Sequence, residues 1–243
     1  MGASELENVQ TVFLDLDDTL YHQGGGLSDV IRSRIETYMC ENLGVDESNV
    51  SEIRKELFRK HGSSLNGLRS KYNVDANHFW EYIHKDIDYT KYVNPDPKLK
   101  SILESRKPGF KCYIFTNAHR EHAYKTLEVL GLQENLHFDG ILDLSVLDLA
   151  NKPQAISYER ALKLAGENAP ERAVLVDDQV RNLIGARNQG IQAIWLKCES
   201  ESDPNSIQAE AGNLAHQDIP KDVSILFSIH DLPSLLPHIF QST

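Results

Sequence analysis

The second half of the chain alternates short apolar segments with helical ones, and this alternation constrains the fold more than any other feature. The apolar segments lie at 111–116 (KCYIFT), 138–144, 173–176 (AVLV) and 191–196, and the helical patterns lie at 119–130, 153–165 and 180–189. An earlier buried-strand pattern, VQTVFLDL at 9–16, belongs to the same series. Such alternation predicts βαβ units and a parallel sheet covered by helices on both faces. In sheets of this kind, ligands bind beyond the carboxyl ends of the strands.

The region between the first strand and the rest of the sheet has a different pattern. Apolar residues recur at helical spacing from Leu27, and no convincing strand is present before Pro95 and Pro97. We therefore expect a helical insert, with the core at 1–22 plus 106–243 and the insert at 23–105. The run Gly24-Gly25-Gly26 is compatible with a joint that lets the insert move, although a simple loop explains it equally well.

The end of the chain is less clearly patterned. Residues 199–223 are polar and acid-rich without a clear period, so a mobile segment and an ordered flap are both open. A short strand at 223–228 and a helix at 232–240, with Asp231 as its cap, are expected to follow.

Composition excludes several classes of function. The formal net charge is -11, so nucleic acid should be repelled at long range. No apolar run is long enough for a membrane span, and the N-terminus does not resemble a secretory signal. The three cysteines are far apart and form no CxxC pair, which favours reduced thiols. We expect a cytoplasmic protein that does not bind nucleic acid or membranes.

The first candidate site residues follow the strand at 9–16. Asp15 and Asp17 should share one side of the chain, because successive strand residues point to opposite faces. Two carboxylates at the end of a buried strand need a function or a counter-ion, and Mg²⁺ prefers such oxygen ligands. One carboxylate could attack phosphorus while the other handles the proton. A solvated acidic turn is the alternative reading of this motif.

Three further polar motifs follow other predicted strands: Thr116-Asn117, Lys152, and Asp177-Asp178. Taken singly, Thr116-Asn117 can be explained as turn chemistry, Lys152 as a surface lysine and Asp178 as a helix cap, whereas Asp177 has no such explanation. Because all of them follow separate strands, they should meet at one edge of a parallel sheet. One active site explains this better than independent structural accidents.

The ordered motifs DLDDTL, FTN, NKP and VDDQ resemble the haloacid dehalogenase-like (HAD) superfamily over about residues 11–196. The resemblance implies an α/β fold with a three-layer Rossmann-like core and an inserted all-helical cap. It also implies that Asp15 is the nucleophile and Asp17 the general acid and base. Thr116 and Lys152 would bind the phosphoryl group, with help from Asn117. Mg²⁺ would be held by the Asp15 carboxylate, the Asp17 carbonyl and Asp178, with support from Asp177.

A closer resemblance, to pyrimidine 5′-nucleotidases of the fungal and plant type, rests on DLDDTLY, HGSSLNGL, FTNAHREHA and VDDQVRNLIGA. It implies hydrolysis of UMP or CMP, although Gln179 replaces an expected Ser. With the cap closed over the site, residues such as Asn66, Arg69 or His122 would then select the substrate, a small phosphorylated metabolite. A phosphatase for a sugar phosphate, flavin mononucleotide or lysophospholipid remains an alternative, as does a non-catalytic regulatory protein.

Overall fold

A parallel sheet forms the centre of the molecule in the computed structural model, which describes residues 6–21, 25–197 and 223–241. The strand order is β3-β2-β1-β4-β5-β6, and every neighbouring pair is parallel. The strands are β1 (Thr11–Leu14), β2 (Lys111–Phe115), β3 (Gly140–Leu142), β4 (Ala173–Asp177), β5 (Gln192–Leu196) and β6 (Ser224–Leu226). The predicted α/β fold with a parallel sheet is confirmed.

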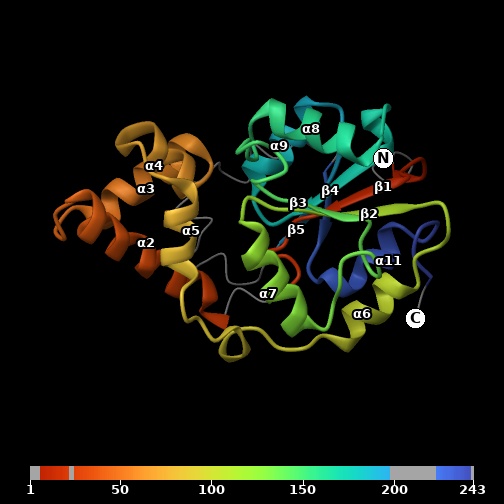
Figure 1. The fold of residues 1–243 in the computed structure, drawn as a ribbon. Helices are drawn as coiled ribbons and strands as arrows, with labels where there is room; N and C mark the ends of the chain where they lie inside the picture. Colours follow the sequence, from red (N-terminus) through yellow and green to blue (C-terminus); the bar gives the residue numbers. More distant parts are fainter. Residues whose placement is uncertain (1–5, 22–24, 198–222, 242–243) are drawn as a thin grey trace.

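Helices cover both faces of the sheet (Figure 1). One face carries α8 (Ala155–Ala165) and α9 (Val180–Asn188), and the other carries α6 (Pro97–Glu104), α7 (Arg120–Leu130) and α11 (Leu232–Leu235). The central strand β1 shows the alternation that this requires. Phe13 packs in the cluster beneath α8 and α9, whereas Val12 and Leu14 pack in the opposite cluster.

The insert is entirely helical within its described residues and lies to one side of the sheet (Figure 1). It consists of α2 (Leu27–Leu43), α3 (Val50–His61), α4 (Ser64–Tyr72) and α5 (Ala76–His84). These helices bury a hydrophobic cluster of their own around Tyr38, Phe79 and Trp80. The limits at residues 22 and 105 stay predictions. Because α6 buries Leu99 and Ile102 in the core cluster, we propose a boundary ahead of α6.

Two predicted helices differ from the observed ones. The helix expected at 153–165 begins at Ala155, because Gln154 has extended backbone angles and the peptide of Lys152 is bound by Asn117. The helix expected at 232–240 ends at Leu235, where Pro237 biases the preceding residue, Leu236, away from helical angles. Asp231 precedes this helix but makes no side-chain cap bond.

Some expectations fall outside the described residues: Gly24, Cys198 and nearly all of the acidic segment 199–223. Among the helices that the structure describes, none combines the length and apolar character needed to cross a membrane.

Candidate active site

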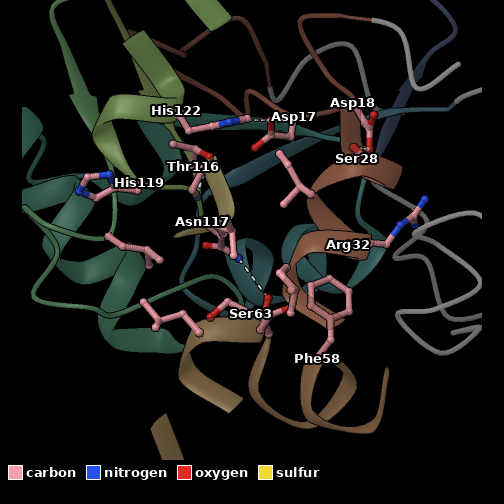
Figure 2. A pocket seen from close by; sticks show the side chains of 18 of the residues that line it. Asp17, Asp18, Ser28, Arg32, Phe58, Ser63, Thr116, Asn117, His119 and His122 are labelled. Atoms are coloured by element: carbon pink, nitrogen blue, oxygen red, sulfur yellow. Dashed lines mark hydrogen bonds and ion pairs between the residues drawn. The ribbon is translucent and has the colours of Figure 1, made fainter. Parts of the chain in front are cut away.

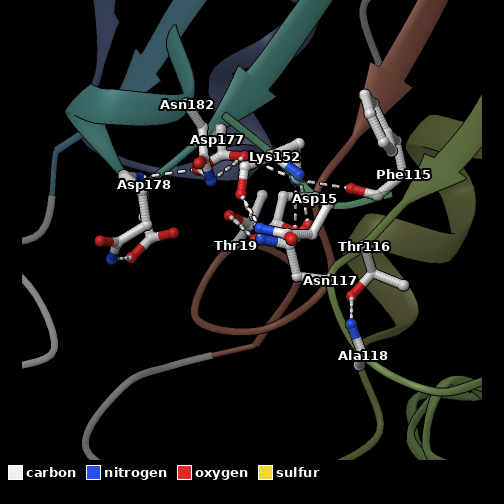
Figure 3. A network of polar contacts seen from close by, with 12 residues as sticks. Asp15, Thr19, Phe115, Thr116, Asn117, Ala118, Lys152, Asp177, Asp178 and Asn182 are labelled. Atoms are coloured by element: carbon white, nitrogen blue, oxygen red, sulfur yellow. Dashed lines mark hydrogen bonds and ion pairs between the residues drawn. The ribbon is translucent and has the colours of Figure 1, made fainter. Parts of the chain in front are cut away.

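The strand-end residues meet at one edge of the sheet, as expected, and Lys152 is at the centre of their contacts (Figure 3). Its ammonium Nζ donates to Asp15 Oδ1 at 2.8 Å, to Asp177 Oδ2 at 2.7 Å and to the carbonyl of Phe115 at 2.6 Å. Lys152 is fully buried, and Asp15 is 7% exposed. Three acceptors therefore satisfy the three donors of the ammonium and fix it beside the candidate nucleophile.

Asp177 is the last residue of β4, Asp178 follows it, and the two differ in their surroundings. Asn182 Nδ2 donates to both oxygens of Asp177 at 3.0 Å, and the backbone N–H of Gln179 donates to Asp177 Oδ1 at 2.8 Å. Gln179 Nε2 donates to Asp178 Oδ2 at 2.7 Å, so the residue that departs from the expected Ser orients a carboxylate. Asp177 is thus fixed in orientation by side-chain and backbone donors, while Asp178 lines the pocket.

The carboxylates at this edge would be stabilised in their ionised form by a positive charge in addition to that of Lys152. Burial raises the pKa of Asp15 to about 8 against the lowering effect of Lys152, and Asp177 adds to the rise. Burial and the neighbouring Asp177 also raise the pKa of Asp178 well above its usual value. Among the described residues, ligand atoms of Asp15, Asp177 and Asp178 lie within 4.8 Å of one another. These buried oxygen donors fit a hard divalent cation such as Mg²⁺, which would favour their ionised forms.

Thr116 and Asn117 follow β2 and have different roles in the structure. The Oγ1 of Thr116 accepts from the N–H of Ala118 at 3.0 Å, which uses an oxygen lone pair and leaves the hydroxyl proton for another acceptor. Asn117 Oδ1 accepts from the N–H of Lys152 at 2.8 Å, and its Nδ2 donates to the carbonyl of Lys152 at 2.9 Å. Both residues line the pocket, but the amide of Asn117 chiefly binds the peptide of Lys152.

Asp17 lies apart from this acidic cluster. Its Oδ1 accepts from Tyr21 Oη at 2.6 Å and from His122 Nε2 at 2.7 Å, and Tyr89 Oη is hydrogen-bonded to His122 Nδ1 at 3.0 Å. Burial works to raise the pKa of Asp17, but the His122 ring and the bonds from His122 and Tyr21 outweigh it, so the pKa is lowered. Asp17 therefore has an ionised carboxylate with a fixed orientation.

A pocket opens over these groups between the sheet edge and the insert (Figure 2). Its floor is polar, with Asp15, Asp17, Thr116 and Asp178. The apolar part of its walls from the insert consists of Ile31, Ile35, Phe58, Leu65, Phe79, Trp80 and Ile83, and polar side chains of the insert, Ser28, Arg32, Arg54, Ser63, Ser64 and His84, line it as well. Trp80 of α5 stacks on His119, which precedes α7, with ring centroids 4.1 Å apart. The insert thus closes a largely apolar space above the carboxylates.

The three residues suggested as selectors of substrate lie in different places. His122 lines the pocket and contacts Asp17. Asn66 donates to the carbonyl of Leu149 at 2.8 Å, and Arg69 is exposed on α4. Neither is among the described residues that line this pocket.

Sequence reasoning missed Tyr21, Tyr89 and Asn182. A signal existed for two of them, since Tyr21 lies four residues after Asp17 and Asn182 lies on the first turn of the helix after Asp177-Asp178. Tyr89 gave no signal, because its contact with His122 depends on how the insert folds back on α7.

Comparisons with known proteins agree with this geometry. Residues 9–190 match the family model described as haloacid dehalogenase-like hydrolase. Phosphate metabolism protein 8 of Saccharomyces cerevisiae is 24% identical over 92% of this chain and 71% of its own length. A glyceraldehyde 3-phosphate phosphatase of Pyrococcus furiosus is 24% identical over 91% of this chain and 94% of its own.

The fold is also similar to that of the HAD-hydrolase YfnB from Bacillus subtilis bound to magnesium. The TM-score is 0.55 at 16% identity, and the alignment covers 94% of this chain and 98% of that one. Because the family model spans most of the chain and the predicted motif residues meet at one site, the chain belongs to the haloacid dehalogenase-like hydrolase family.

Proposed function

We propose that this protein is a Mg²⁺-dependent phosphatase that forms an aspartyl-phosphate intermediate, with pyrimidine nucleoside 5′-monophosphates as its substrates. The observation that carries the proposal is the contact of buried Lys152 with Asp177 and with Asp15, which lines a pocket beneath the insert. A buried carboxylate beside a fixed cation suits attack on a phosphoryl group, whose negative charge the cation offsets.

In the first step, an oxygen of Asp15 forms a bond to phosphorus and the ester oxygen departs. Lys152 balances the charge of the nucleophile and of the transferring group, because its Nζ is 2.8 Å from Asp15 Oδ1. The Thr116 hydroxyl, buried at the pocket floor, donates to a phosphoryl oxygen. Asn117 contributes by holding the Lys152 peptide through both ends of its amide.

Asp17 moves the protons. It gives a proton to the leaving oxygen and later takes one from the water that attacks phosphorus, which breaks the bond to Asp15 and releases phosphate. The lowered pKa of Asp17 suits the second task. For the first task, the negative charge of a bound phosphate ester favours protonation of the nearby carboxylate.

The donor set fits Mg²⁺, which would be held by the carboxylates of Asp15 and Asp178 and the backbone carbonyl of Asp17, with Asp177 in support. When bound, Mg²⁺ would supply the positive charge that keeps these carboxylates ionised near neutral pH and that offsets charge on the phosphoryl oxygens.

The walls of the pocket support an aromatic leaving group, because the rings of Phe79 and Trp80 line them and would pack on a nucleobase. Ser28, Ser63 and Ser64 line the same pocket and would bond the hydroxyl groups of a sugar phosphate, which keeps that substrate class as an alternative. The preference for pyrimidines rests on the family resemblance. The sugar-phosphate activity named for the Pyrococcus relative makes a small sugar phosphate the second candidate.

The test is phosphate release, with Mg²⁺, from UMP, CMP, AMP, GMP, flavin mononucleotide, a lysophosphatidate and glyceraldehyde 3-phosphate. We expect turnover of UMP and CMP, its loss in Asp15→Asn with the fold intact, and its loss in EDTA with recovery on adding Mg²⁺. Turnover of another ester alone would retain the mechanism and reject the nucleotidase assignment. Phosphate release by Asp15→Asn would reject the mechanism, and no turnover of any ester would favour a non-catalytic role.

A further inference from the structure

At the end of α3, the backbone of the insert touches the loop that carries Lys152. Gly62 ends α3 with a left-handed φ of 81°. A Cβ at this position would lie 2.4 Å from Asn151 Nδ2, 2.7 Å from the carbonyl oxygen of Lys152 and 3.0 Å from Pro153 Cδ. Only glycine fits without displacing the loop, so the backbone of the insert packs directly on the peptide of Lys152.

Two core asparagines bridge this contact. Asn151 is fully buried, and its Nδ2 donates to the carbonyl of His61 at 3.0 Å and to that of Lys152 at 2.7 Å. Asn117 Nδ2 donates to the carbonyl of Lys152 at 2.9 Å and to that of Gly62 at 3.4 Å. Each amide therefore binds the end of α3 and the Lys152 peptide at once.

The insert supplies the third bridge. Asn66 Nδ2, on α4, donates to the carbonyl of Leu149 at 2.8 Å and also to Asn151 Oδ1. Asn66 thereby orients the amide that holds Lys152. This explains why a residue expected to select the substrate is directed at the core loop instead.

A core cation holds the end of α3 from the other side. Arg181 Nη1 donates to the carbonyl of Phe58 at 3.2 Å, and its Nη2 donates to that of Gly62 at 3.3 Å. Its guanidinium also lies over the Phe58 ring, 4.2 Å from the centroid. A cation at the carboxyl end of a helix interacts favourably with the helix dipole, so this contact favours the docked insert.

We propose that the segment 61–66 of the insert, through Gly62 and Asn66, is a positioning element for Lys152, and that Asn151 of the core loop is a further positioning residue. Docking of this segment fixes the Lys152 peptide and thereby sets its ammonium on Asp15. Closure of the pocket and assembly of the Asp15–Lys152 pair are then one event. The inference rests on the proposed function, because it assigns the segment to the same phosphoryl-transfer site.

The consequence is a larger effect on kcat than on KM, since Asn66 lies outside the pocket lining and a side chain at position 62 would press on the Lys152 loop. A displacement of about 1 Å at a reacting group can lower turnover by about 100-fold. The Nζ contacts of Lys152 are between 2.6 and 2.8 Å, so a shift of that size in its peptide would break them unless the side chain compensated.

The test compares Gly62→Ala with Gly44→Ala. Gly44 is also a left-handed helix end, with φ 66°, but a Cβ there meets nothing within 4 Å. Both variants thus share the backbone strain, and only Gly62→Ala disturbs the Lys152 loop. We expect Gly62→Ala to lower kcat by about 30- to 100-fold with KM within about threefold. It should also speed amide hydrogen exchange in peptides covering 149–155, whereas Gly44→Ala should do neither.

Asn66→Ala provides a second variant should Gly62→Ala fail to fold, because it removes the two donated bonds without adding atoms. We expect a roughly tenfold lower kcat and faster exchange at 149–155. An unchanged kcat and unchanged exchange in the variants that fold would overturn the inference while wild-type turnover upholds the proposed function. If the wild type hydrolyses no ester, the proposed function fails, and the exchange comparison alone decides whether the segment holds the Lys152 loop.

Discussion

The sheet edge and the helical insert face each other across one pocket and are built from opposite kinds of side chain. At the sheet edge, Asp15, Lys152 and Asp177 are buried, and the ammonium of Lys152 bonds to Asp15 at 2.8 Å and to Asp177 at 2.7 Å. The insert presents mainly apolar walls, with Phe58 and Trp80 among them. Buried charges hold one another in a single arrangement, whereas apolar walls accept changes of shape at modest cost. From this contrast we infer a division of labour within the proposed function: the core would perform the chemistry, and the insert would enclose and select the substrate.

Each region also contains a buried cation. Replacing the two cations in turn tests most directly whether the sheet edge and the insert have different roles. Lys152 contacts two buried carboxylates, whereas Arg54 of α3 pairs with Glu36, whose side chain is 27% exposed. Both cations line or adjoin the same pocket, yet only Lys152 contacts the candidate nucleophile.

The largest effect is expected from Lys152→Met. It leaves Asp15 and Asp177 buried without their shared cation, so the free energy of unfolding should fall by about 3 to 5 kcal/mol. Turnover should fall by about 1,000-fold or more, because the charge that stabilises the transferring phosphoryl group is lost. Denaturant unfolding and phosphate release measure the two effects.

Arg54→Met is the matched control for Lys152→Met. Its stability loss should be smaller, since water can solvate the partly exposed Glu36, and kcat should stay within about threefold. A fall in kcat as large as that of Lys152→Met would mean that the insert also takes part in catalysis, and it would contradict the division of roles between sheet edge and insert.

A smaller effect is expected from Trp80→Leu, which removes an aromatic wall and its stack on His119. An aromatic pair contributes about 0.5 to 1.5 kcal/mol beyond area burial, so KM for UMP should rise by up to about tenfold. The KM for glycerol phosphate, which has no ring, should change by less than about twofold, and Trp80→Phe should restore most of the binding of UMP. Equal changes for both substrates would mean that Trp80 supports the fold without selecting the ligand.

The two regions also differ in how far the sequence predicts them. The sheet and the meeting of Asp15, Lys152 and Asp177 follow from local patterns, because each polar motif comes after a buried strand and parallel strands share one edge. The contact of Asp17 with His122 joins residues 105 positions apart and depends on how α7 packs, which no local pattern encodes.

Asn117 shows why roles are harder to predict than positions. An amide at a strand end can bind phosphate or a neighbouring peptide, and the residue type does not distinguish the two. Its Oδ1 and Nδ2 are both used by Lys152, because the loop before α8 places that peptide beside β2. Likewise, the sequence predicts that Asn66 lies in the insert, but it does not predict that the side chain of Asn66 contacts Leu149.

The smallest effect concerns the pH dependence of stability and comes from His84 at the end of α5. Burial and then the nearby His122 lower the pKa of His84 to about 3, so the folded protein keeps this ring neutral at pH 6. In the unfolded chain, a histidine takes up a proton below about pH 6.5, so acid favours unfolding. Between pH 7 and pH 6 this group should lower the free energy of unfolding by about 0.7 kcal/mol.

His84→Gln removes that proton uptake. We compare the slope of the free energy of unfolding against pH in the two proteins, so any loss of stability that is the same at every pH cancels. Denaturant unfolding at pH 7, 6.5 and 6 should show a shallower fall in stability for the variant than for the wild type. Parallel curves would mean that His84 is protonated in the folded protein too. In that case the pocket wall formed by the insert would be more polar than its contacts indicate, and the contrast with the sheet edge would be weaker than we infer.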